Sequence, residues 1–375
     1  MYLPIKPSKY MKTQKSIVTR KIQLLINSQD EQVRQTVKET LWQWQHFCFR
    51  AANQIATHHF IQDQLKELFY LRDEIKVKLA DVHKDPEGIL TTSKTNTTYQ
   101  VLSRRYKQEM PMAILGSLNN TLVASYNKEK EAYWKGERSL RNYKRSIPIP
   151  IPAKAIVNIQ PSENSKNYSF SVYALPFRTY FGKDLSDKVT MWKRSLNGEY
   201  KLCDSSIQLD KGKIFLLAVF QFEKVPRALN AEIVAEAKLS MEIPIVVRIN
   251  RHQYNIGTKE DVLYRRLAIQ EALRRCQKSA MYNRTKNGKA RMLQKVSKFR
   301  DMERRYISYK LHVYSRRLID LCIKFKAATL ILVDQDQNEE QAKGEQFIMR
   351  NWNYCGLRDK ILYKADKAGI AVVIE

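Results

Sequence analysis

An alternating isoleucine–proline run, residues 147–152, limits the fold of this chain more than any other feature. Proline restricts its own backbone, has no N–H to donate, and disfavours helical geometry in the residue before it. Three prolines at alternate positions therefore exclude a helix and predict extended, polyproline-like chain. Because the periodicity of the sequence differs on the two sides of this run, it predicts a change of architecture within the chain.

The region before the run has the periodicity of α-helix. Its apolar residues fall at steps of three and four and form one stripe, which consists of Val33, Val37, Leu41, Trp44, Cys48, Ala51 and Ile55. Further helix is predicted over 61–82 and 98–135, and a strand is predicted over 16–26. The sequence therefore predicts a mainly helical region that follows a single strand.

The region after the run favours β structure over residues 155–225, which are rich in β-branched and aromatic side chains. Asn197-Gly198 and Lys211-Gly212 are expected to form turns between strands. Farther along, the predicted elements are a strand at 243–250, helices at 260–285 and 290–326, a strand at 328–334, a helix at 356–368 ended by Gly369, and a strand at 370–375. Strands that alternate with helices predict an α/β domain, so the whole chain is expected to be α+β and multidomain.

The charge of the chain points to a polyanionic partner. Lysine and arginine total 66 against 38 acidic residues, which gives a formal net charge of +28. No apolar run reaches the length of a bilayer span, and the N-terminal sequence has no apolar signal core. The 5 cysteines are scattered without a CxxC pair, which argues against a zinc finger or ribbon and favours a reducing cytoplasm. The expected location is therefore the cytoplasm.

The cations are clustered, and tyrosines lie among them. Guanidinium groups bind phosphates through paired hydrogen bonds, and tyrosine rings can stack on unpaired bases. The candidate RNA- and DNA-binding residues are Arg104, Arg105 and Lys107; Arg138, Arg141, Tyr143, Lys144 and Arg145; Arg274, Arg275, Lys278, Arg284, Lys286, Lys289 and Arg291; and Arg304 and Arg305. Arg265 and Arg266 belong to the third group, and Lys298, Arg300, Tyr306 and Tyr309 to the fourth. Nucleic-acid binding follows, with RNA or single-stranded DNA favoured over duplex.

An acidic stretch follows the predicted buried strand Leu330 to Val333. Its carboxylates are Asp334, Asp336, Glu339 and Glu340. Carboxylates at the end of a buried strand hold magnesium in many enzymes. These four, however, stand in a loop rich in Gln and Glu, which would make a poor rigid cage, so a solvated loop is the preferred interpretation and no metal or other cofactor is expected.

Several stretches resemble the compact type V CRISPR effectors and their transposon-encoded relative, TnpB. The residues that carry the resemblance are "VRQTVKETLWQWQHFCFRAANQIATHHF", "GERSLRNYKRSIPIPIP", "YISYKLHVYSRRLIDLCIKFKAATLILVDQDQ" and "WNYCGLRDKILYKADKAGIAVVIE". They cover nearly the whole chain in the order found in that family. The resemblance implies a wedge-type β-barrel with an inserted helical recognition lobe, followed by an RNase H-like RuvC domain that lacks the zinc ribbon. The implied boundaries are 1–30 and 147–230 for the wedge barrel, 31–146 for the recognition lobe and 231–375 for the degenerate RuvC-like domain.

The sequence departs from the family where the RuvC nuclease needs three carboxylates around two metal ions. The strand that supplies the first acid is matched to "VVRIN", which puts Arg248 at the aspartate position. Arginine stays protonated, and at about 4 Å it would repel a divalent ion by roughly 8 kcal/mol at an effective dielectric near 20. Val333 stands at the second position, with Asp334 after it, and the third acid of the family lies beyond Glu375. The resemblance therefore predicts a nuclease-inactive member, and not an enzyme.

The implied function is RNA-guided binding of double-stranded DNA beside a short motif, without cleavage. The expected partners are a guide RNA as obligate nucleic-acid partner, the target DNA, a transcription factor or RNA polymerase subunit, and a second copy of the chain in a homodimer. The expected role is transcription regulation, by repression or by recruitment, in association with the bacterial nucleoid. Three alternatives remain open: an active nuclease with displaced acids, drawn from the acidic stretch together with Asp261 and Asp301; a general RNA- or single-strand-binding protein; and a targeting subunit of a transposition system.

Overall fold

The computed structural model describes residues 15–70, 94–162, 166–182, 187–223, 228–240, 243–283, 285–333 and 354–375. The chain is a mixed α+β protein, as predicted, and it divides into two compact units. One unit spans Ile17–Phe222, and the other consists of Met1–Ser16 and Glu223–Glu375. Each unit has its own sheet and its own apolar core. The four domain boundaries inferred from the family resemblance stay a prediction.

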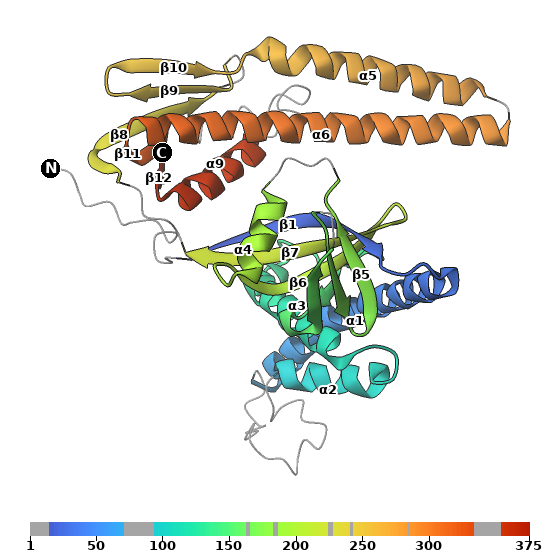
Figure 1. Ribbon diagram of the computed structural model, residues 1–375. Coiled ribbons are helices and arrows are strands. Elements are labelled where there is room, and N and C mark those ends of the chain that lie inside the picture. Colours follow the sequence, from blue (N-terminus) through green and yellow to red (C-terminus); the bar gives the residue numbers. More distant parts are fainter. Residues whose placement is uncertain are drawn as a thin grey trace. The chain divides into compact units, whose positions relative to one another are not determined.

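The unit Ile17–Phe222 is built on a seven-stranded sheet with the order β2-β6-β7-β1-β5-β4-β3 (Figure 1). The strands are β1 (Lys15–Ile26), β2 (Ile149–Ile151), β3 (Ile156–Pro161), β4 (Tyr168–Val172), β5 (Leu175–Tyr180), β6 (Lys201–Asp210) and β7 (Lys213–Glu223). The isoleucine–proline run forms β2, which lies at an end of the sheet order, where a strand with proline is tolerated. Alternate residues of β4 are buried, as expected for a sheet with one face on a core.

Two glycine turns were predicted in this unit, and one of them is confirmed. Lys211 and Gly212 connect β6 to β7 with φ values of 50° and 75°, the left-handed geometry of a two-residue hairpin loop. Asn197 and Gly198 instead follow the helix α4 (Lys188–Leu196). The prediction of a turn between strands was wrong there, because the same left-handed glycine also ends helices.

Besides α4, the described part of this unit has three longer helices: α1 (Glu31–Tyr70), α2 (Lys94–Tyr106) and α3 (Met112–Trp134). The predicted stripe of α1 is buried from Val37 to Ile55, whereas Val33 in the first turn is 37% exposed. The helix predicted over 98–135 is two helices, and α3 begins after Pro111, which has no N–H to continue a preceding helix. Residues 71–82 of the other predicted helix lie outside the described residues.

The second unit is built on a five-stranded sheet with the order β10-β9-β8-β11-β12. Its strands are β8 (Asn230–Leu239), β9 (Ile245–Ile249), β10 (His252–Ile256), β11 (Ala327–Val333) and β12 (Ala371–Ile374). The neighbours β8, β9 and β10 pair antiparallel, whereas β11 runs parallel to both β8 and β12. The central strand β8 was not predicted, because alanines alternate with charged residues there and give a weak β signal.

Three helices accompany this sheet: α5 (Lys259–Tyr282), α6 (Lys286–Lys324) and α9 (Tyr354–Ala368). The second half of α6 buries Leu311, Tyr314, Leu318 and Cys322 in one cluster with residues of the sheet and of α9. This confirms the apolar face predicted for residues 311–325. Gly369 follows α9 with φ of 78°, the predicted helix-ending geometry. Among the described helices, none is long and apolar enough to cross a bilayer.

Candidate nucleic-acid interface

The helices α5 and α6 form a long antiparallel hairpin that carries most of the predicted cations (Figure 1). Thr258 and Thr285 begin the two helices, and each hydroxyl accepts a hydrogen bond from a backbone N–H of the first turn, at 3.3 Å. The two helices run in opposite directions, so the second half of α5 lies beside the first half of α6. Two groups of cations that are separate in sequence are therefore brought together along one hairpin.

Most of these cations are exposed to solvent. The exposed members are Arg265, Arg274, Arg275, Lys278, Lys286, Lys289, Arg291, Lys298, Arg300, Arg304 and Arg305. Arg284 lies outside the described residues. Surface pairs such as Arg274 with Glu271, at 3.1 Å, involve exposed groups and restrain the guanidinium only weakly. The hairpin therefore presents a strongly positive surface that a phosphate backbone can approach.

Arg266 is the exception among the predicted cations of the hairpin. Its side chain is 5% exposed, and its Nε lies 2.7 Å from the Glu303 carboxylate of α6. Gln270 donates to the same carboxylate at 3.4 Å. Sequence clustering placed Arg266 with the binding residues, but its burial makes it a link between the two helices.

Exposed aromatic rings accompany the cations on the hairpin. Tyr264, Tyr282 and Tyr309 are 72%, 77% and 62% exposed. The Arg265 guanidinium lies 5.0 Å from the centre of the Tyr306 ring. Rings with an open face can stack on unpaired bases, so the hairpin combines both groups that single-stranded nucleic acid needs.

The second predicted cluster follows α3 and is organised by one carboxylate. Glu129 accepts hydrogen bonds from Arg141 and Tyr133, and Arg138 lies 2.8 Å from it. These contacts, chiefly the hydrogen bond from Arg141, lower the pKa of the Glu129 carboxyl to about 2. Two of the four cations of the cluster therefore share one carboxylate, which offsets one of their charges, and the spacing of the sequence could not show this.

The other two cations of this cluster are exposed, on a segment that the half-buried Tyr143 ties to α1. The Tyr143 backbone N–H donates to the Asn53 side chain at 2.8 Å, and the Tyr143 carbonyl accepts from Asn53 at 3.1 Å. Lys144 and Arg145 follow directly and are exposed. Because the Tyr143 backbone beside them is hydrogen-bonded to α1, the backbone positions of Lys144 and Arg145 are fixed relative to this helix.

The first predicted cluster lies at the end of α2. Arg104, Arg105 and Lys107 are all exposed, and the Arg105 guanidinium lies 5.7 Å from the Tyr106 ring. Cations in the last turn of a helix are favoured by its dipole. The position of these cations at the helix end and the Arg105–Tyr106 contact indicate that they stabilise α2, and their exposure leaves them accessible to nucleic acid.

The positions matched to catalytic acids lie on the five-stranded sheet. Arg248 is on β9, where its Nε donates to Gln253 of β10 at 3.2 Å. Val333 is the last residue of β11. Both β9 and β11 flank β8, so Arg248 and Val333 are not on neighbouring strands and are separated by two strand spacings, about 10 Å or more.

The strand that directly flanks β11 contributes two charged residues that sequence reasoning missed. Glu236 of β8 pairs in register with both Ile331 of β11 and Arg248 of β9. Lys238 pairs with Val333. The row through Val333 therefore carries the cation Lys238 beside the end of β11. The row through Ile331 carries the carboxylate Glu236 beside β11 and the cation Arg248 one strand farther away. Only the topology reveals them, because β8 has no strong strand pattern in the sequence.

A carboxylate cluster was also considered as a metal site. Within the described part of the chain, no group of three or more His, Cys, Asp and Glu side chains could hold a metal ion. The acidic stretch Asp334, Asp336, Glu339 and Glu340 lies outside the described residues. Of the other two acids considered, Asp261 forms an ion pair with Lys310 at 3.5 Å, and Asp301 is half-buried on α6.

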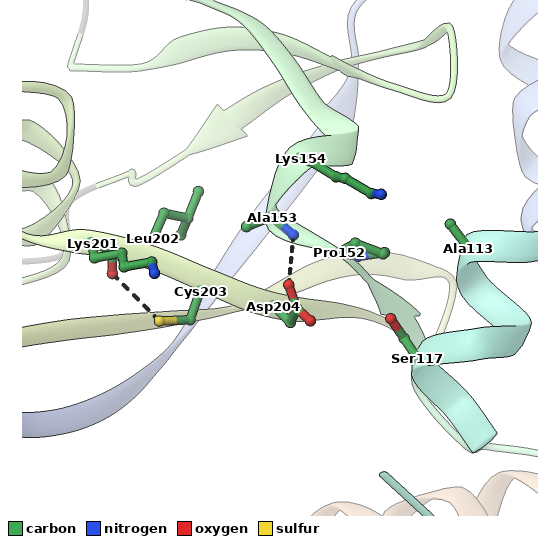
Figure 2. Close-up of a pocket in the computed structure, with 9 residues that line it drawn as sticks. All are labelled: Ala113, Ser117, Pro152, Ala153, Lys154, Lys201, Leu202, Cys203 and Asp204. Atoms are coloured by element: carbon green, nitrogen blue, oxygen red, sulfur yellow. Dashed lines mark hydrogen bonds between the residues drawn. The ribbon is translucent and has the colours of Figure 1, made fainter. Parts of the chain in front are cut away.

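A hollow of about 690 Å³ lies in the unit Ile17–Phe222, between the first turns of α3 and the strand β6 (Figure 2). Asp204 accepts a hydrogen bond from the Ala153 N–H at 2.9 Å, and Ser117 lies on the facing wall. Among the described residues that line this hollow, Lys154 and Lys201 are the cations, the apolar side chains include Pro152 and Leu202, and none is aromatic.

The chain is similar to known proteins both in sequence and in fold. No protein-family model matches the chain. "CRISPR-associated endodeoxyribonuclease Cas12f1" of Sulfoacidibacillus thermotolerans is 25% identical over 277 residues, which are 69% of this chain and 65% of that protein. The chain thus spans slightly less than two thirds of the length of this relative.

The fold is also similar to a solved structure described as the "Cryo-EM structure of the Cas12f1-sgRNA-target DNA complex". The TM-score is 0.67 at 12% sequence identity, over 96% of this chain and 89% of that one. At that identity the likeness concerns the fold alone, and it extends over both units. The resemblance to compact type V CRISPR effectors that the sequence motifs indicated is confirmed. The chain is a homologue of Cas12f1, a type V CRISPR effector.

Proposed function

We propose that this chain binds a guide RNA and, through base pairing of that guide, occupies double-stranded DNA without cutting it. The homology to Cas12f1 over 277 residues carries the RNA-guided part of the proposal. The exposed cations and tyrosines of the α5–α6 hairpin support it independently, because they suit a phosphate backbone with unpaired bases. In such a system the protein recognises the shape and the backbone of the heteroduplex, while the guide recognises the sequence.

In this proposal the two units correspond to the parts that the family resemblance implied. The seven-stranded sheet would be the wedge-type barrel, and the helices α1, α2 and α3 the recognition lobe inserted into it. The sheet β10-β9-β8-β11-β12 would be the RuvC-like domain, with three antiparallel strands followed by two parallel ones. The similarity of the whole fold to a Cas12f1 chain supports this correspondence.

The absence of cleavage rests on the residues around the end of β11. Val333 has no ligating atom, Lys238 of the adjacent strand β8 pairs with it in register, and Arg248 lies one strand farther away, on β9. A divalent ion placed there would meet the positive charge of Lys238 on the adjacent strand and, at greater distance, that of Arg248. We therefore propose that DNA binding is retained and that metal-dependent cleavage is lost.

Occupancy without cleavage suits a transcription regulator. Such a protein can block a promoter, or bring a transcription factor or polymerase subunit to it, and a targeting role in transposition uses the same binding. A homodimer on one guide remains part of the proposal. Placing the matched target upstream of, or within, the promoter of a reporter gene separates activation from repression by the sign of the change.

One observation favours a second candidate, an active nuclease with displaced acids. Glu236 is a carboxylate on the strand that directly flanks β11. Its cross-strand partner is Arg248, which would neutralise a carboxylate rather than leave it free for a metal ion. Magnesium-dependent nicking that disappears in Glu236→Gln would establish the second candidate and exclude the first.

Sequencing of the RNA that co-purifies with the chain tests the guided mechanism. We expect a homogeneous RNA with a shared structured scaffold and a variable segment that matches DNA. A heterogeneous pool without a shared scaffold would instead identify a general RNA-binding protein. The same RNA also identifies the DNA target, because the variable segment of the guide is complementary to it.

A further inference from the structure

The distal half of the α5–α6 hairpin carries positive charge without any acid in its own sequence. From Ala272 to Arg300 there are ten lysines and arginines and no aspartate or glutamate. Glu271 and Asp301 are the acids that flank this segment, and Glu271 is paired with Arg274 at 3.1 Å. Cations of both helices therefore lie along one rod, and a phosphate backbone is the partner with the complementary charge.

This half of the hairpin extends beyond the core of its own unit. Among the described residues, Ile307 is the first of α6 that packs against that core. It follows Lys286, where the helix begins, by about 20 residues, which corresponds to about 30 Å of helix. Ala280 of α5 and Val296 of α6 are each 5% exposed, which indicates apolar packing between the two helices. The two helices therefore support each other, and the end of the rod lies away from their sheet (Figure 1).

Two apolar side chains stand at the end of this rod. Met281 and Tyr282, in the last turn of α5, are 84% and 77% exposed, more than any other large apolar side chain among the described residues. Because so little of either side chain is buried, folding does not account for the pair. The faces of the bases are the apolar surfaces of nucleic acid, so a methionine and a tyrosine at the end of a cationic rod fit a base stack.

The start of α6 is closely packed against Asn283, the residue that follows α5. The Thr285 hydroxyl donates to the Asn283 side chain at 3.2 Å and accepts from the Gly288 N–H at 3.3 Å. A Cβ at Gly288 would lie 2.7 Å from the Thr285 hydroxyl oxygen, so the glycine permits this close approach. The end of the hairpin is thus held by hydrogen bonds, which lowers the entropic cost of inserting Met281 and Tyr282 into a base stack.

A junction between paired and unpaired DNA suits this arrangement better than either form alone. A protein that reads duplex DNA places polar side chains on base edges, whereas the end of this rod is apolar. A single-strand site offers rings to successive bases, whereas Tyr264, the other strongly exposed ring of α5, is about 27 Å of helix away from Tyr282. Apolar wedges, methionine among them, unstack base steps, and a tyrosine can stack on a base that has been freed.

We propose that the end of the α5–α6 hairpin is a wedge that separates the strands of the target DNA, with Met281 against the last base pair and Tyr282 stacked on the first unpaired base. The exposed Lys278, Lys286 and Lys289 bind the phosphates beside this junction. The inference rests on the proposed guided binding of DNA and gives the hairpin a specific part in it, because a guide pairs only with bases that have been unpaired. The wedge is tolerant of sequence, since every base has a face for stacking.

Binding of fluorescein-labelled DNA to the RNA-free chain tests the wedge without a guide. We expect a forked duplex to bind more tightly than a blunt duplex of the same length. Met281→Ala with Tyr282→Ala should weaken fork binding by roughly 5- to 150-fold, the effect of losing one base–aromatic stack, so that the preference for the fork disappears. The slope of log K against log salt should stay unchanged, because no cation is removed. Tyr264→Ala is the matched control: its ring is 72% exposed near the start of α5, and its loss should leave the preference intact.

A preference for the fork that survives the double variant, with its fold unchanged by circular dichroism, would overturn the wedge. An equal effect of Tyr264→Ala would show stacking on single strands along the whole rod instead of a site at its end. Tighter binding of a forked RNA than of the forked DNA would assign the end of the hairpin to the guide and would overturn the DNA contact.

Two matched targets, one fully paired and one with a pre-opened bubble, test the wedge in the purified ribonucleoprotein. The double variant should bind the bubble as tightly as the unmodified chain does and should bind the paired target roughly 5- to 150-fold more weakly. Equal losses on both targets would refute strand separation while the proposed function stands. If the unmodified ribonucleoprotein does not prefer a matched target, the proposed function fails, and the fork measurement still decides whether the hairpin end is a wedge.

Discussion

The buried ion pair between Arg266 and Glu303 should hold the α5–α6 hairpin together, and Glu303→Gln tests this. The substitution leaves the Arg266 charge without its partner in a site where the arginine side chain is 5% exposed and the glutamate 19% exposed. Removing one partner of a buried pair costs about 3–5 kcal/mol, and the partial exposure of Glu303 favours the lower figure, about 3 kcal/mol. In a unit of this size, that loss lowers the unfolding midpoint by roughly 6–12 °C.

Thermal unfolding followed by circular dichroism, together with hydrogen exchange of the α5 and α6 amides, measures the effect. Glu271→Gln is the matched control, because it breaks the exposed pair with Arg274 on the same helix and should change stability by no more than about 0.5 kcal/mol. The double change Arg266→Leu with Glu303→Leu should restore most of the stability, since apolar residues can replace a buried pair. A loss below about 1 kcal/mol for Glu303→Gln would show that the pair is solvated and would refute this reasoning.

Two further predictions follow from single positions. Gly257 has φ of 82°, and a Cβ there would lie 2.7 Å from the Tyr314 ring. Gly257→Ala should therefore lower the free energy of unfolding of the second unit by about 2–4 kcal/mol, measured by urea unfolding. An unchanged urea midpoint would contradict the close contact between this backbone and the Tyr314 ring. Glu129 has its pKa lowered to about 2 in the folded state, so its contribution to stability is present above its unfolded pKa and is lost as pH falls towards 2. The stability difference between the unmodified chain and Glu129→Gln should therefore disappear in acid, and a difference that persists at pH 2 would contradict the assignment. At neutral pH the same variant releases Arg138 and Arg141, so its RNA affinity should depend more steeply on salt than that of the unmodified chain.

The sequence predicts that the segment after α3 binds RNA, and the structure indicates which of its cations should contribute most. Changing Arg141, Lys144 and Arg145 together to alanine should weaken RNA binding and flatten its salt dependence. Because Arg141 is held by Glu129, most of the change should come from Lys144 and Arg145. An unchanged slope in the variant Lys144→Ala with Arg145→Ala would show that this segment does not face RNA.

Local patterns in the sequence predicted the parts of the fold that local physics determines. The apolar stripe of α1, the hairpin loop at Lys211-Gly212 and the helix end at Gly369 each depend on residues a few positions apart. Hydrophobic periodicity and the left-handed preference of glycine are sufficient to place them. The isoleucine–proline run likewise marked the point where helix gives way to sheet.

The elements that escaped prediction depend on partners that are distant in sequence. The strand β8 is central because it pairs with both β9 and β11. Its own sequence, in which alanines alternate with charged residues, indicates neither a strand nor a helix. Arg266 could be distinguished from the other cations only through Glu303, which lies on another helix. In the same way, the neutralisation of Arg141 depends on Glu129. Clustering of charge in a sequence therefore predicts a polyanionic partner, but it does not show which cations are already paired within the protein.

The central claim is guide-dependent DNA occupancy without cleavage, and a single plasmid experiment tests it most directly. The purified ribonucleoprotein is incubated with magnesium and with supercoiled plasmids that carry either the matched or a scrambled target, and bound and cleaved species are separated by electrophoresis. We expect retention of the matched plasmid alone, with all of it still supercoiled after the protein is removed. Nicked or linear plasmid would contradict the loss of the nuclease, and equal retention of both plasmids would contradict guided binding.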